Sequence, residues 1–138
     1  MKKIIFIFSF IFLILLQTQA NQSVVVSAIV GNQNSAPIII SVNPDSNPRI
    51  LKTNRTQSYT LYFRDNEKDF VSYTITPKNG YTTPISGTIK SSDYDNNNGA
   101  YINFLYLAPA TAYPDENITV TINDGTSIVS KELNLYVY

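Results

Sequence analysis

The chain contains no cysteine and no histidine. Without cysteine, no disulfide can cross-link the fold and no N-terminal thiol can carry a lipid, so stability has to come from buried apolar area. Without histidine, the chain lacks the usual base of serine and cysteine hydrolases and a common ligand of catalytic zinc. The most common enzyme centres are therefore unavailable. The sequence predicts a protein that is not an enzyme and that uses no organic cofactor.

An excess of charge of either sign is also missing, because ten Lys and Arg balance ten Asp and Glu. After residue 20 the chain holds eight basic and ten acidic side chains, and these do not cluster. This distribution argues against nucleic acid or an anionic membrane surface as a partner.

Glycine is scarce, whereas Asn, Thr, Ser and Tyr are abundant, a composition that suits half-exposed strands joined by polar turns.

The first twenty residues have the pattern of a secretory signal peptide. Two lysines precede an unbroken apolar run over residues 4–16, and a small-x-small cleavage motif ends at Ala20. The run is too short to span a bilayer comfortably. We therefore expect cleavage after Ala20 and a mature chain that is secreted or held at the cell surface, with no membrane insertion. The predicted organisation is a signal peptide (1–20), an N-terminal strand or linker (21–36) and one domain (37–138).

Period-2 alternation of apolar and polar side chains is the main structural signal after the leader. It recurs between turn residues spaced eight to twelve positions apart, as in a sandwich or a barrel. We predict seven or eight strands around one core, with a short piece at residues 49–53 that changes sheet. The clearest inward-facing sets are Tyr59, Leu61 and Phe63; Val71, Tyr73 and Ile75; Ile102, Phe104 and Tyr106; Ile118, Val120 and Ile122; and Leu133, Leu135 and Val137.

Three segments resemble the immunoglobulin-like and cadherin-like domains of bacterial surface proteins. Residues 106–125 read Tyr-x-x-Pro-x-x-x-Tyr, followed by Thr-Val-Thr-Ile-Asn-Asp-Gly, which is similar to the penultimate strands of those domains. Residues 59–75 resemble their acidic loop and its two flanking strands, and residues 34–37 their domain start. The resemblance implies an immunoglobulin-like Greek-key β-sandwich that serves as a spacer, adhesive or assembly module. Lys68 within the acidic loop departs from the family pattern.

Carboxylates in this acidic loop form a candidate calcium site. Asp65, Glu67 and Asp69 occupy alternate positions, and Asp124 ends a strand that a sandwich could bring to the same end. Calcium takes six to eight oxygen ligands, so such a group is chemically suitable. The alternative is a solvated turn, because acidic residues are common in turns and Lys68 offsets part of the charge.

The β-branched run at residues 23–31 is long enough for one strand and precedes the domain. It is either a tail or spare edge strand of its own domain, or a donor strand that completes the sheet of another copy. A donor strand of this kind would build an open, head-to-tail homopolymer. The side chains that would bind the partner are Val24, Val25, Val26, Ile29 and Val30.

Two function classes therefore remain. One is a secreted, non-enzymatic structural or adhesion module that contacts other surface proteins or glycans through loops or outward-facing tyrosines, with a calcium-binding spacer as a variant. The other is a pilus-like filament subunit that polymerises by donor-strand exchange. The tyrosines expected to face outward are Tyr62, Tyr101, Tyr136 and Tyr138.

Overall fold

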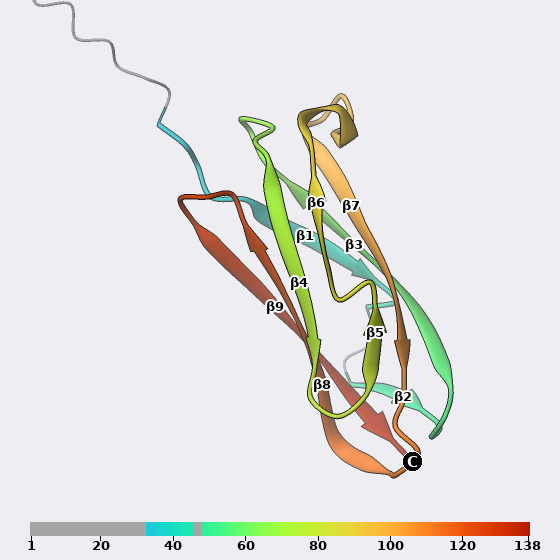
Figure 1. The fold of residues 1–138 in the computed structure, drawn as a ribbon. Helices are drawn as coiled ribbons and strands as arrows, with labels where there is room; N and C mark the ends of the chain where they lie inside the picture. The colour runs from blue at the N-terminus through green and yellow to red at the C-terminus, as the bar shows by residue number, and fades with distance from the viewer. Residues whose placement is uncertain (1–32, 46–47) are drawn as a thin grey trace, which may run out of the picture. The chain divides into compact units, whose positions relative to one another are not determined.

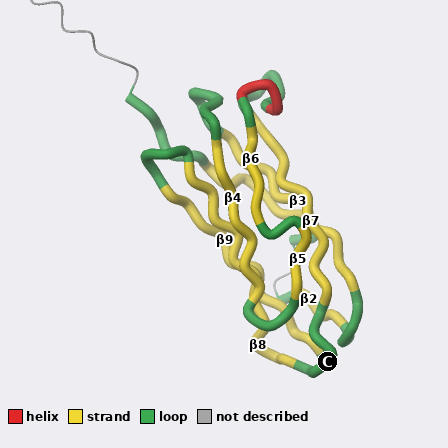
Figure 2. Tube along the Cα trace, viewed as in Figure 1, coloured by secondary structure: helices red, strands yellow, loops and turns green. Residues whose placement is uncertain are grey.

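The structure is a computed structural model that describes residues 33–45 and 48–138 (Figure 1). These residues form two β-sheets, with strand orders β1-β3-β7-β5 and β2-β9-β8-β4-β6. Figure 2 shows that strands, in yellow, make up most of the domain. The predicted all-β sandwich is confirmed, with nine strands in place of the seven or eight expected. The strands are β1 (Ile38–Asn43), β2 (Arg49–Leu51), β3 (Thr56–Arg64), β4 (Val71–Pro77), β5 (Tyr81–Thr83), β6 (Ser86–Ile89), β7 (Gly99–Leu107), β8 (Tyr113–Asn123) and β9 (Ile128–Val137).

The extra strand arises between residues 81 and 89, where one weak strand was expected over residues 85–90. β5 pairs with β7 in one sheet, whereas β6 pairs with β4 in the other. Pro84 separates them, and a proline cannot donate to a ladder of hydrogen bonds. The chain therefore leaves one sheet at this residue and joins the other.

The connections from β3 to β4 and from β7 to β8 both pass from one sheet to the other. Because β3 neighbours β7 and β4 neighbours β8, these crossings give a Greek-key arrangement.

The N-terminal part of the domain is also shared between the sheets. β1 pairs with β3, while β2 runs parallel to the end of β9 with Arg49 opposite Leu135. The predicted change of sheet at residues 49–53 is thus confirmed.

The core lies between the sheets and is built mainly of the inward-facing sets that alternation predicted, joined by Val42, Ile89, Tyr94, Ala100 and Ala108. Tyr59 of β3 stacks on Phe104 of β7 with ring centroids 5.2 Å apart. Two predicted core residues, Tyr73 and Leu133, are only partly buried. Leu133 lines a groove at the edge of its sheet, which is described below. None of the described residues lies in a helix of the length and apolar character needed to cross a membrane.

Candidate functional site

Among the described residues, one edge of β9 is without a neighbouring strand along most of its length. β8 pairs with one side of β9 from Ile128 to Val137, but on the other side β2 covers only Leu135 to Val137. Within the described ranges, the backbone from Ile128 to Asn134 therefore has no strand on the side away from β8. Unpaired N–H and C=O groups at such an edge are ready to bind another strand.

A groove of about 260 Å³ opens between this edge and β1, the outer strand of the facing sheet. We call it the seam groove. Its volume is slightly below the roughly 300–1,000 Å³ of typical small-molecule sites. The residues that line it are Ile39, Ile40, Ser41, Val42, Pro44, Asp45, Tyr59, Lys131, Glu132, Leu133 and Asn134.

Lys131 is the unusual residue of the seam groove. It pairs in register with buried Val120, as Leu133 does with buried Ile118, so Lys131 belongs to the inward-facing row of β9. A charged side chain on the inward row of an edge strand discourages indiscriminate pairing. Any strand added beside β9 has to leave room for this side chain.

The β1 wall of the groove is less regular than the β9 wall. Its register against β3 shifts between Ile39 and Ser41, so Ile40 is an extra residue that bulges from the strand. Ile38 and Ile40 are 60% and 48% exposed. A bulge bends a strand and interrupts its hydrogen-bonding pattern, which makes β1 the poorer template for pairing. The predicted donor residues, from Val24 to Val30, lie outside the described residues.

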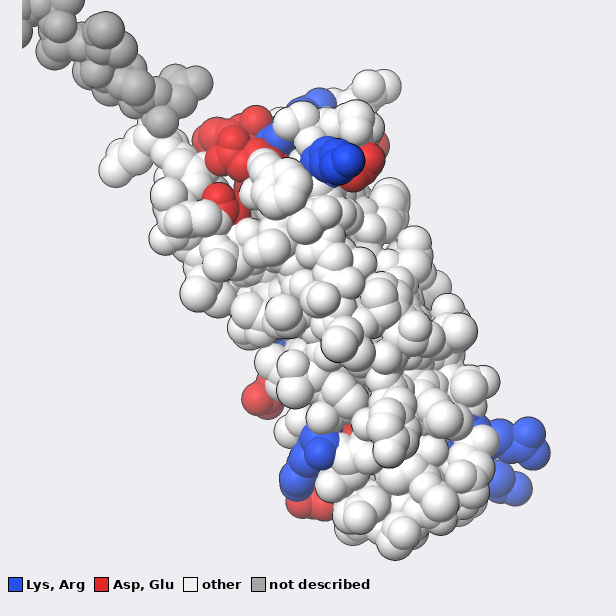
Figure 3. Space-filling model, viewed as in Figure 1, with Lys and Arg blue, Asp and Glu red and all other residues white. Residues whose placement is uncertain are grey.

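Three of the four predicted calcium ligands, Asp65, Asp69 and Asp124, lie close enough to Tyr94 to act on its ionisation, and the backbone of Glu67 bonds to Asp65. Figure 3 shows acidic side chains gathered at one end of the domain. Asp65 is 2% exposed, and its Oδ1 accepts the backbone N–H groups of Glu67 (3.0 Å) and Asp69 (3.3 Å). Burial raises the pKa of Asp65 despite these bonds, and its Oδ2 is buried without a protein partner. The Ser35 hydroxyl lies 2.9 and 2.8 Å from the two oxygens of Glu67.

Asp124 is held by its own turn and by the segment that precedes β1. Its Oδ1 accepts the N–H groups of Thr126 (2.8 Å) and Ser127 (2.6 Å), and its Oδ2 accepts the Asn34 amide (3.1 Å). Burial opposes ionisation of Asp124, but these bonds outweigh it, and its pKa lies below the ordinary value. The Oδ1 of Asn34 is buried without a partner, like the Oδ2 of Asp65.

These carboxylates act mainly as acceptors for their own loops. In the part of the chain that the structure describes, no three Asp, Glu, His or Cys side chains are grouped so as to hold a metal ion. The hydroxyl of Tyr94 donates to the carbonyl of Asp69 (3.0 Å). Burial and the nearby negative charges, that of Asp65 foremost, raise the pKa of Tyr94. Calcium binding stays a prediction.

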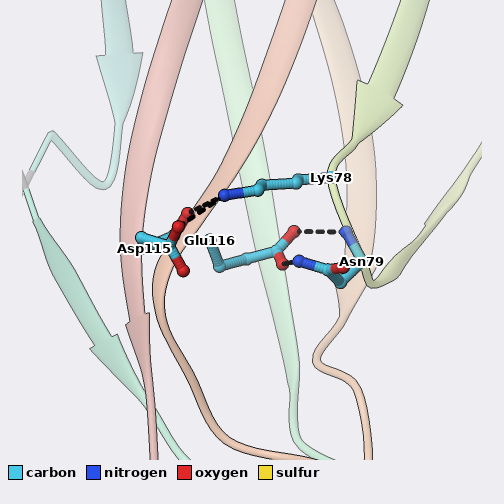
Figure 4. Close-up of polar contacts among 4 residues, drawn as sticks. All are labelled: Lys78, Asn79, Asp115 and Glu116. Carbon is cyan, nitrogen blue, oxygen red and sulfur yellow. Dashed lines mark hydrogen bonds and ion pairs between the residues drawn. The ribbon is translucent and has the colours of Figure 1, made fainter.

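Two adjacent carboxylates at the other end of the sandwich, Asp115 and Glu116, behave differently (Figure 4). Asp115 is exposed and forms a 2.6 Å ion pair with Lys78, which lowers the pKa of Asp115. Glu116 is 1% exposed and accepts both the backbone N–H (3.1 Å) and the side-chain amide (2.9 Å) of Asn79. Because they face opposite sides of β8, they do not form an acid–base pair. Glu116 instead fixes the turn after β4.

The outward-facing tyrosines do not form one platform. Tyr62 and Tyr101 lie side by side on the first sheet, with ring centroids 4.8 Å apart. Tyr136 lies on the second sheet, and Tyr138 follows its last strand. Tyr101, Tyr136 and Tyr138 are exposed as predicted, whereas Tyr62 is half-buried and hydrogen-bonds to Asp95 (3.3 Å).

Sequence reasoning missed the residues of the seam groove. One signal for it was present, because the inward row through Leu133, Leu135 and Val137 extends back to Lys131, a charged residue where the core pattern calls for an apolar one. The β1 residues that form the other wall of the groove gave no such signal in the sequence. β1 lies at the edge of its sheet because of how the strands pair, and strand pairing cannot be read from local alternation.

No protein-family model and no curated protein matches the chain. Among solved structures, the chain is similar to the ASH/PapD-like domain 7 of human CEP192, with a TM-score of 0.42, 10% identity, and 82% of this chain and 95% of that chain covered. It is also similar to domains 4 and 5 of the S-layer protein SbsC, with a TM-score of 0.38, 13% identity and coverages of 73% and 54%. The chain thus spans about half the length of that SbsC structure. The narrower resemblance to bacterial immunoglobulin-like and cadherin-like domains stays a prediction.

Proposed function

We propose that the chain is a secreted, non-enzymatic structural module of the cell surface whose copies associate by strand addition at the seam groove. The observation that carries the proposal is the free edge of β9 from Ile128 to Asn134, which lies beside the groove. In this binding mode, main-chain hydrogen bonds provide affinity and alternate side chains provide register. The N-terminal leader supports the placement outside the cell.

The donor in this proposal is the apolar run at residues 24–30. It has seven residues, and so does the free edge of β9. An apolar run is a ready partner for an unpaired edge, and pairing the two would cover apolar surface and unpaired backbone groups together. Association of this type gives a filament-like homopolymer, in which each copy completes the sheet of the next.

The experiment removes the donor. Deleting residues 21–32 is expected to leave a folded β-sandwich by far-UV circular dichroism that no longer forms large species in sedimentation or negative-stain microscopy. Val26→Asp is expected to act in the same way by burying an unpaired charge, whereas the matched change Gln22→Asp, outside the run, leaves assembly intact. If the full chain is monomeric at high concentration and the deletion unfolds it, the proposal is wrong.

A calcium-binding spacer is the second candidate function. It is favoured by the two buried oxygens that lack protein partners, Asp65 Oδ2 and Asn34 Oδ1. Bound calcium raises the melting temperature by mass action, and Asp65→Asn is expected to remove that rise. Identical melting curves with millimolar calcium and with a chelator would leave these carboxylates as loop acceptors only.

A further inference from the structure

We infer that Lys131 prevents two copies of the chain from pairing edge to edge through β9, and that it thereby keeps this edge open for a strand of different sequence. The inference concerns the edge named in the proposed function and rests on that function only for the purpose that the open edge serves. It adds which partner strand the edge rejects and which side chain rejects it.

A two-fold pairing of β9 with the β9 of a second copy is the self-association that the open edge invites. Within the described residues, the side of β9 away from β8 is unpaired from Ile128 to Asn134. Unpaired backbone groups at an edge bind other strands. A two-fold axis perpendicular to the sheet makes the two β9 strands antiparallel and places the inward rows of both copies on the same side. Such a contact is closed and would end at two copies.

The length of the open stretch and the alternation of its side chains fix the register of this pairing. Directly opposite residues of an antiparallel pair point to the same face, so inward residues have to lie opposite inward residues. β2 ends the open stretch at Leu135. Pairing the whole stretch therefore places Ile128 opposite Asn134 of the second copy. At the centre, Lys131 lies opposite Lys131 of the second copy.

The two lysines would meet in an unfavourable place. Opposite residues of an antiparallel pair have Cβ atoms about 4.5–5.5 Å apart, and like charges at such positions are destabilising. Lys131 lines the seam groove, whose walls also include Ile39, Val42 and Leu133. Beside apolar walls, the repulsion between the two ammonium groups is screened less than at an open surface.

No carboxylate of the described chain offsets the charge of Lys131. Asp45 and Glu132 also line the groove. Among the described residues, however, neither of them forms an ion pair with Lys131, and the ion pair that is present joins Lys78 to Asp115. Lys131 would therefore meet the second copy as an uncompensated positive charge.

Shifted registers do not remove the penalty. The smallest shift that keeps the inward rows together moves one strand by two residues and places Lys131 opposite Val129 or Leu133. The paired stretch then shrinks to residues 128–132 or 130–134, so backbone hydrogen bonds are lost. An ammonium group is still brought against an apolar side chain inside the groove, where an unpaired charge is costly.

A strand of different sequence meets only one lysine. With a single ammonium group in the groove, the lysine stem can lie along the apolar wall while the charge reaches water. Lys131 therefore disfavours the closed dimer more than it disfavours a heterologous strand. Heterologous addition of that kind gives an open assembly.

Two substitutions at Lys131 separate its charge from its size. Lys131→Met keeps a long, unbranched side chain without the charge, and the mature full-length chain carrying it is expected to sediment as two copies. Lys131→Arg keeps the charge and is expected to sediment like the unchanged chain. Lys131 is exposed, so both variants are expected to fold, which far-UV circular dichroism checks. The inference is wrong if Lys131→Met sediments like the unchanged chain or if Lys131→Arg also forms the dimer.

Cysteine cross-links test the register, because the chain has no cysteine of its own. Lys131→Met chains carrying Ser130→Cys are mixed with Lys131→Met chains carrying Glu132→Cys and oxidised. A disulfide between the two is expected, since Ser130 lies opposite Glu132 in the inferred pairing and opposite residues are within disulfide range. The same cysteines in chains that keep Lys131 are expected to give no link, and a link there overturns the inference.

Each cysteine variant is also oxidised alone. A link between two Ser130→Cys chains, or between two Glu132→Cys chains, belongs to one of the shifted registers and overturns the inferred one. A Lys131→Met dimer that forms none of these links overturns the pairing through β9.

The proposed function is judged on the unchanged chain, whereas this inference is judged on the Lys131→Met chain. If the unchanged chain forms no large species but Lys131→Met gives the linked dimer, the proposed assembly is wrong and the role of Lys131 is supported. If both chains form the same large species and no dimer appears, the proposed assembly is supported and the role of Lys131 is wrong.

Discussion

Replacing Glu116 by alanine tests how the structure uses a buried carboxylate. Glu116 is 1% exposed and accepts two hydrogen bonds from Asn79, at 3.1 Å and 2.9 Å. Hydrogen bonds to a charged group contribute about 1.5–3 kcal/mol each. Part of this is offset because the alanine variant no longer buries a charge, and Asn79 is exposed enough for water to replace its lost partner.

The net cost of Glu116→Ala is therefore about 3 kcal/mol of unfolding free energy. For a domain of this size, that lowers the melting temperature by roughly 12–24 °C. Urea denaturation followed by circular dichroism measures the free energy, and thermal melts give the temperature. Glu116→Gln is expected to lose much less, because the glutamine oxygen still accepts the backbone N–H of Asn79.

Asp115→Ala is the matched control. Its carboxylate neighbours Glu116 in sequence but faces solvent, with its side chain 73% exposed and bound to Lys78. Exposed ion pairs of this kind contribute little to stability, so the urea midpoint is expected to stay unchanged. If Glu116→Ala is also silent, or if the two variants are equally destabilised, then Glu116 does not hold the turn after β4 and the reasoning is wrong.

Three further predictions concern stability. Phe104→Ala removes the ring stacked on Tyr59 and is expected to cost about 3–5 kcal/mol in urea denaturation, so a silent change would contradict its place in the core. Gly99→Ala places a methyl group against the Tyr62 ring and is expected to cost about 1–3 kcal/mol, and Tyr62→Ala in the same chain should relieve the clash. Burial raises the pKa of Asp65 in the folded state. The protonated Asp65 side chain therefore stabilises the fold fully at a pH below its unfolded-state pKa, and this stabilisation is lost as the pH rises through its folded-state pKa. In the presence of a chelator, Asp65→Asn is therefore expected to melt higher than the unchanged chain at neutral pH, with the difference shrinking toward pH 3, and a difference independent of pH would refute the cause.

The amino-acid sequence by itself determined which residues face the core. Alternation is a local property of each strand, so the inward sets of β3, β7 and β8 could be read directly. Extending the inward rows of β8 and β9 back by two residues reaches Glu116 and Lys131, but neither residue was assigned to an inward row from the sequence. One core for one domain and the sheet change at residues 49–53 also followed from pattern and turn residues.

Only the tertiary structure decided which edges stay open and which carboxylate oxygens stay unpaired. In the part of the chain that the structure describes, β2 covers only three residues of β9 and leaves one side of residues 128–134 unpaired, a matter of long-range pairing that no local pattern records. The sequence suggested Asp65 and Asp124 as members of one calcium site. The structure shows that each carboxylate accepts hydrogen bonds from backbone N–H groups of its own loop, which the sequence did not indicate. A strand's alternation depends on its own residues, whereas its neighbours and its hydrogen-bond partners depend on the whole chain.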